Sequence, residues 1–136
     1  MLPFLLFAAA MNCPVLTTPT ARGAIGDVQV KVSHSGKDAE KDSYTCQFTG
    51  ADSELVIEVS TLANAGQFAH FAETACDGAH DKTALKGIGN EALACTLDQT
   101  EKIAGRVRNQ AFLIRLTKSS RSVARDIAET VAGNLF

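Results

Sequence analysis

Alternating apolar and polar positions predict two groups of short strands along the chain. A period of two is typical of a strand that buries one face. The first group lies before residue 60 and the second lies after residue 92. The predicted strands cover the segments 28–32, 44–48, 55–59, 93–95, 103–107 and 111–117. We expect Gly50–Ser53 to turn the second strand into the third as a hairpin.

Helical spacing appears in three segments that separate and flank these strands. The first, over 17–26, has Thr18 as a candidate cap, Pro19 at its first position and Gly26 as its stop. The second runs from Asn64, its candidate cap, to about Cys76. Its apolar face is formed by four residues, Phe68, Phe71, Ala72 and Ala75.

The third helical segment closes the chain. Val123, Ile127, Val131 and Leu135 recur at intervals of four, which predicts an amphipathic helix with one apolar face. Ser120 or Ser122 is placed to cap it.

Two polar segments, 33–43 and 77–86, are expected to be loops. The predicted order is then α-β-β-β-α-β-β-β-α. Short strands joined by tight turns favour an α+β fold with an antiparallel sheet of five to six strands and helices packed on one face.

The first ten residues have the character of an export signal. They form an apolar run that ends in three alanines, and no charged residue precedes Arg22. This run is too short to span a membrane and has the length of the apolar core of a signal peptide. We therefore expect residues 1–10 to be the remnant of a signal and 11–136 to be one exported domain, periplasmic or extracellular. The alternative is that the run forms a first strand or buried helix of the domain.

Composition narrows the class of protein. The 136 residues include 13 Lys and Arg against 15 Asp and Glu, for a net charge of -2, and 46% are hydrophobic. Such a chain can fold around its own core. The slight acidic balance argues against binding to nucleic acid, because such domains usually carry a basic excess.

Four cysteines allow three disulfide connectivities. The order of the elements favours Cys13–Cys46 and Cys76–Cys95, which close two separate loops. Export would permit oxidation. Lipidation of Cys13 is the alternative for that residue, but it requires a small preceding residue, and Asn12 is a poor fit. We therefore expect no lipid anchor.

A zinc site is the competing interpretation of the later cysteines. Its ligands would be His70, Cys76, His80 and Cys95. The closely spaced ligand pairs that are usual in zinc sites do not occur in the sequence. We therefore expect no metal and no cofactor.

One basic cluster is a candidate interaction surface. Lys102, Arg106 and Arg108 share strand parity, and Arg115 on the next strand is placed to join them. A solvated sheet face explains these charges without any function. The functional alternative is a patch that binds a polyanion, an acidic partner or lipid headgroups.

Several short motifs resemble those of a family of small exported bacterial proteins and lipoproteins. The motifs are CPVLT at 13–17, Cys46 with a nearby aromatic residue, GIGNEA at 87–92 and VAGNLF at 131–136. The family is abundant in actinobacteria and is classed as a domain of unknown function. The resemblance covers the chain from Cys13 onward and departs at Phe48, where the family commonly has a tryptophan. It implies an extracytoplasmic α+β domain with Cys13 opposite Cys46, and it supplies no activity.

The functional expectation is a non-enzymatic binding module. It would hold a small ligand or a cell-envelope protein between the sheet and a helix. The alternative is a small secreted hydrolase or inhibitor whose site comes from loop residues such as His34, His80 and Asp81. The Gly87-Ile88-Gly89 segment lacks the third glycine of a dinucleotide-binding loop, so it is interpreted as a turn.

Overall fold

The structure is a computed structural model, and it describes residues 12–38, 40, 42–117 and 123–136. In these residues one antiparallel sheet has seven strands in the order β1-β2-β3-β7-β6-β5-β4. The strands are β1 (Lys31–Asp38), β2 (Ser43–Thr49), β3 (Glu54–Thr61), β4 (His80–Leu85), β5 (Glu91–Leu97), β6 (Thr100–Val107) and β7 (Gln110–Thr117). The helices are α1 (Thr18–Ile25), α2 (Phe68–Ala75) and α3 (Ala124–Leu135), with a 3-10 turn, η2 (Ala65–Gln67), before α2. The α+β class is confirmed, whereas the expected strand number was wrong.

The prediction failed at the two edge strands. β4 lies inside the segment 77–86 that was expected to be a loop, and β1 occupies most of the other expected loop. The first strand begins after Val28, which is 85% exposed. An edge strand lacks a neighbour on one side and here exposes most of its side chains, so it shows no clear apolar alternation.

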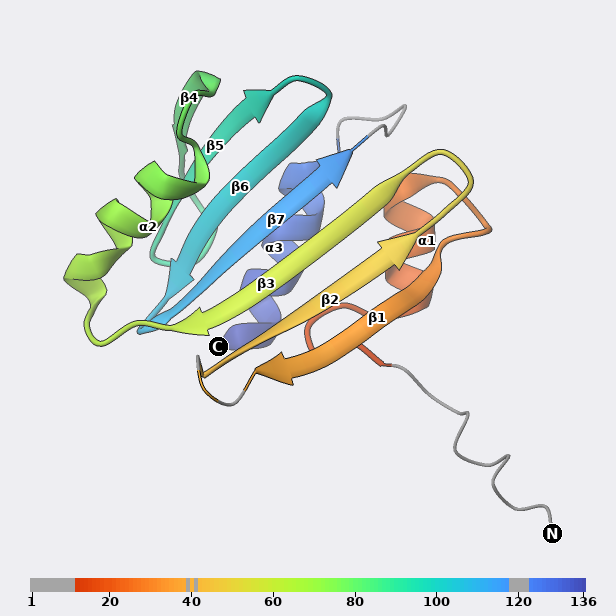
Figure 1. The fold of residues 1–136 in the computed structure, drawn as a ribbon, viewed down its shortest axis with the longest axis horizontal. Coiled ribbons are helices and arrows are strands. Elements are labelled where there is room, and N and C mark those ends of the chain that lie inside the picture. The colour runs from red at the N-terminus through yellow and green to blue at the C-terminus, as the bar shows by residue number, and fades with distance from the viewer. Residues whose placement is uncertain (1–11, 39, 41, 118–122) are drawn as a thin grey trace, which may run out of the picture.

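The helices lie on both faces of the sheet, not on one as expected. Figure 1 shows α2 on the near face of the sheet, with α1 and α3 behind it. The main core packs α1 and α3 against one face, where Phe112 and Ile114 are fully buried. A smaller cluster packs α2 against the other face through Ala104 and Leu113. β7 is therefore buried on both faces.

One close contact shapes the centre of the main core. Gly105 on β6 is the Cα partner of Phe112 on β7. A Cβ at Gly105 would overlap the Phe112 ring, so the absent side chain is what lets the ring lie across the neighbouring strand.

The caps differ in detail from the expectations. Thr17, not Thr18, caps α1, because its hydroxyl accepts from the Thr20 amide at 3.3 Å. Gly26 ends α1 in the left-handed conformation, with a φ of 78°, as expected. Asn64 precedes η2 and makes no side-chain cap hydrogen bond there. Ser120 and Ser122 lie outside the described residues, as does the expected signal remnant at 1–10.

Two disulfides join Cys13 to Cys46 and Cys76 to Cys95. The first ties the segment before α1 to β2, and the second ties the end of α2 to β5. All four cysteines are buried, with exposed fractions of 7% or less. Of the helices described, none combines the length and apolar character needed to cross a membrane.

Candidate functional site

A groove with a volume of about 730 Å³ lies between α2 and the sheet. This is within the range of roughly 300–1,000 Å³ that is usual for small-molecule sites. Residues of η2, α2, β3 and β7 line it, together with the residue that follows β3. The lining is Glu58, Leu62, Gln67, His70, Phe71, Thr74, Ala75 and Leu113. The groove is open to solvent along one side of the helix.

The helical period of α2 explains the mixed lining of the groove. Phe68 and Ala72, four residues apart, are buried against the sheet. Phe71 and Ala75 are half-buried at the edge of this contact, and His70 and Thr74 are exposed. On this side of the helix, apolar side chains therefore lie close to the sheet, and polar side chains form the rim of the groove farther from it.

The sheet supplies the floor. Leu113 on β7 and Glu58 on β3 are Cα partners, so their side chains lie on the same face of the sheet. Leu113 is only 8% exposed, because α2 packs over it. Leu62 closes one end, where its amide donates to the Asn109 carbonyl at 2.7 Å.

The end of α2 is fixed by two neighbouring attachments to the sheet. Cys95 and Lys102 are Cα partners on β5 and β6. Cys95 is bonded to Cys76 at the C-terminus of α2, and the Lys102 ammonium donates to the Ala75 carbonyl at 3.1 Å. A cation at this position satisfies a helix-end carbonyl and suits the helix dipole.

Two of the four predicted basic residues lie together beside the groove. Lys102 and Arg115 are Cα partners, directly opposite each other on β6 and β7. Arg115 forms an ion pair with Glu58, and both side chains are more than a third exposed. These two cations therefore stand on the same sheet face as α2, each with a partner of its own.

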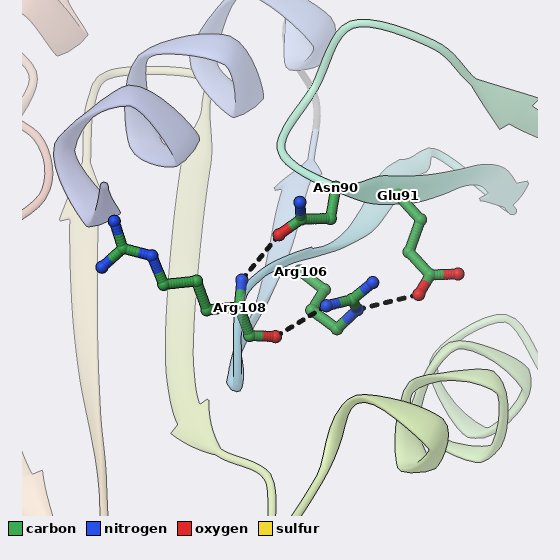
Figure 2. A network of polar contacts seen from close by, with 4 residues as sticks. All are labelled: Asn90, Glu91, Arg106 and Arg108. Carbon is green, nitrogen blue, oxygen red and sulfur yellow. Dashed lines mark hydrogen bonds and ion pairs between the residues drawn. The ribbon is translucent and has the colours of Figure 1, made fainter.

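The other two predicted basic residues belong to a separate network (Figure 2). The Arg106 guanidinium forms an ion pair with Glu91 at 2.8 Å and donates to the Arg108 carbonyl at 2.8 Å. The Arg108 amide donates to the Asn90 side chain at 2.7 Å. Figure 2 shows that the Arg108 guanidinium points away from the network. Arg108 lies in a turn with a φ of 56°, so the shared strand parity expected for it was wrong.

A second groove, of about 510 Å³, lies on the other side of α2. It runs between Phe68, Ala72 and Glu73 on the helix and residues 84–93, which comprise the end of β4, the turn after it and the start of β5. Gly87 and Gly89 in that segment have positive φ values of 83° and 60°, which fits the predicted turn. α2 therefore separates the two grooves.

The histidines of the alternative site are far apart. His34 lies on β1 and His80 on β4, which are opposite edges of the sheet, not in loops as expected. Six strand spacings separate these edges, or about 29 Å. The structure therefore forms no common site from His34, His80 and Asp81. His70 lies on α2, as expected, and lines the first groove.

The Cys76–Cys95 disulfide argues against the zinc interpretation. Cys76 and Cys95 are bonded to each other, so their sulfurs are not thiolate ligands. Within the described residues, no three His, Cys, Asp or Glu side chains are grouped to hold a metal ion.

Sequence reasoning missed most of the groove. Glu58, Leu62, Gln67 and Thr74 carried no motif. One signal was present in the continuous apolar run 111–114, because such a run is typical of a strand buried on both faces. It indicates that both faces of this part of the sheet are covered.

Comparisons with known proteins inform the fold alone. No protein-family model matches the chain, and no curated protein matches it significantly in sequence. A crystal structure from Thermotoga maritima, described as a GTP binding regulator, is similar with a TM-score of 0.53. The similarity covers 90% of this chain and 90% of that chain at 9% sequence identity. What this chain shares with the regulator is the arrangement of its sheet and helices.

Proposed function

We propose that this protein is an exported, non-catalytic binding module that holds a small, partly apolar ligand between α2 and the sheet. The observation that carries the proposal is the groove of about 730 Å³, in which Leu62, Phe71, Ala75 and Leu113 supply apolar lining beside several polar side chains. Apolar surface supplies affinity in such sites, and a few polar groups fix the orientation of the ligand.

The disulfides support both the proposed export and the proposal that the ligand binds to a preformed groove. Disulfides persist in oxidising environments such as the periplasm or the extracellular space. The Cys76–Cys95 bond ties the C-terminal end of α2, which is one wall of the groove, to β5 of the same sheet. A wall fixed in advance lowers the ordering cost of binding.

Neither the family resemblance nor the structural neighbour identifies the ligand. Membership in the exported actinobacterial family stays a prediction from the motifs. The GTP binding in the description of the Thermotoga maritima protein belongs to that protein, because 9% identity carries only the fold. The proposal therefore rests on the groove itself.

Nile red, an uncharged apolar dye that fluoresces in apolar sites, tests the groove directly. We expect the wild-type protein to enhance its fluorescence and Thr74→Phe to abolish most of the enhancement, because the new ring would fill the groove. Glu73→Phe is the matched control, since Glu73 is the next residue and lines the opposite groove. Equal enhancement by wild type and Thr74→Phe, with both variants folded by circular dichroism, would rule out the proposed site.

A further inference from the structure

The charges around the groove indicate which class of ligand fits it. This inference rests on the proposed function, because it concerns the same groove. One charged side chain of the sheet, Glu58, lines the groove, and two cations, Lys102 and Arg115, lie beside it. Glu58 lines the groove, Arg115 is its ion-pair partner, and Lys102 contacts Ala75, another lining residue. Of these three side chains, two are cationic and one is anionic.

Both cations have hydrogen-bonding capacity beyond the contacts just described. A guanidinium carries five N–H donors and an ammonium carries three. The Arg115 ion pair engages Nη2, and the Lys102 ammonium donates to one carbonyl. Lys102 and Arg115 are cross-strand partners, and like charges placed directly opposite each other repel. An anion between them would relieve that repulsion.

The apolar part of the groove begins next to this charged end. Leu113 is two residues from Arg115 on β7, so both side chains face the same side of the sheet. Phe71 and Leu62 extend the apolar lining away from the cations. A ligand that fits both parts has one anionic end and one apolar chain.

We propose that the groove binds a single-chain anionic amphiphile, with its carboxylate held by Arg115 and Lys102 and its chain lying along Leu113, Phe71 and Leu62. A medium-chain fatty acid is the simplest molecule of this class. Glu58 competes with the ligand for Arg115, so it limits the affinity for anions. Replacing Glu58 and replacing Arg115 should therefore change binding in opposite directions.

The experiment compares three probes that share one chain length and differ in charge. Dodecanoate and dodecylammonium are titrated below their micelle concentrations and dodecan-1-ol below its solubility limit, and displacement of Nile red reports their affinity. We expect dodecanoate to bind at least tenfold more tightly than dodecylammonium, and this preference to weaken as salt is raised. The proteins compared are wild type, Arg115→Gln and Glu58→Gln, each checked for folding by circular dichroism.

The two variants separate a ligand contact from a structural role. Arg115→Gln should weaken dodecanoate about tenfold, since it removes a charge-assisted hydrogen bond, and leave dodecan-1-ol unchanged. Glu58→Gln should strengthen dodecanoate severalfold. A merely structural ion pair would instead give both variants the same effect on all three probes, which would overturn the inference.

The outcomes also distinguish this inference from the proposed function. If all three probes displace Nile red equally and neither variant matters, the groove binds apolar molecules without selecting anions, and only the inference fails. Tighter binding of dodecylammonium would overturn it as well. If Nile red is not bound in the groove at all, the proposed function fails first, on its own test with Thr74→Phe.

Discussion

Asp27 joins two turns that are distant in the sequence. Its carboxylate accepts hydrogen bonds from the Gln29 amide at 2.9 Å and from the Ala51 amide at 2.8 Å. The turn after α1 is thereby tied to the β2–β3 hairpin. Gly50 makes this approach possible, because a Cβ there would overlap the Asp27 carboxylate.

These contacts give Asp27 a predictable effect on acid stability. Hydrogen bonds from the Gln29 and Ala51 amides lower the pKa of Asp27 below its ordinary value. A pKa lowered by folding contributes stability above the ordinary value, and this stability is lost as the pH falls through the lower, folded value. We therefore expect this loss of stability below about pH 4.

Urea unfolding of Asp27→Asn at pH 7 and at pH 3 measures this contribution. We expect the variant to be less stable than wild type at pH 7 and the difference to shrink at pH 3, which lies below the ordinary pKa of an aspartate, where the contribution of the carboxylate is being lost. Asp52→Asn is a change of the same size in the hairpin turn that Asp27 contacts, and we expect its stability to follow that of wild type at both pH values. A difference that stayed constant between the two pH values would contradict the assigned role of the carboxylate.

The sequence could predict the parity of three of the four basic residues but not their partners. Lys102, Arg106 and Arg115 do lie on one sheet face, as strand alternation implies. Their interactions differ because Arg106 pairs with Glu91, whereas Arg115 pairs with Glu58, which is 57 residues away in the sequence. Partners of this kind depend on strand order, which no local pattern contains.

At the scale of elements, α2 depends on its attachments to the sheet. It has eight residues, and an isolated helix of that length is unstable in water. Phe68 and Ala72 anchor it to the sheet, and Cys76 and Lys102 fix its C-terminal end. The wall of the groove therefore depends on a few attachments.

Removing the Cys76–Cys95 bond should loosen α2 selectively. For Cys76→Ala/Cys95→Ala we expect a loss of about 3 kcal/mol in the free energy of unfolding, from the entropy of the loop that the bond closes. Hydrogen exchange of the α2 amides should also accelerate. Cys13→Ala/Cys46→Ala is the matched control, because it should cost a similar amount but leave exchange in α2 slower than in the first variant. Equal protection of α2 in both double variants would contradict the role of the bond as its clamp.

The elements that could be predicted are those with one buried face. β2, β3, α2 and α3 show the expected period because each buries one face, whereas β7 is buried on both faces and has a continuous apolar run instead. β1 and β4 were misjudged because edge strands expose most of their residues. The side of the sheet that α2 occupies was also missed, since helical spacing shows which helix face is apolar but not which sheet face it meets.

At the scale of the whole molecule, the two faces of the sheet are covered unequally. α1 and α3 cover one face, whereas on the near face in Figure 1 the described part of the chain places α2 over the β6 side of the sheet and no helix over β1 and β2. The groove lies at the boundary between the covered and the uncovered parts of that face. Its existence follows from a sheet of seven strands that carries one short helix on this side.

Amide chemical shifts tell most directly whether this boundary is a binding site. In a titration of the ¹⁵N-labelled, oxidised protein with dodecanoate, we predict shift changes concentrated at residues 62–75 and at 58 and 113–115. Residues of α1 and α3, on the opposite face, should keep their shifts. Changes concentrated on α1 and α3, or no changes at saturating dodecanoate, would contradict the assignment of the groove as the ligand site.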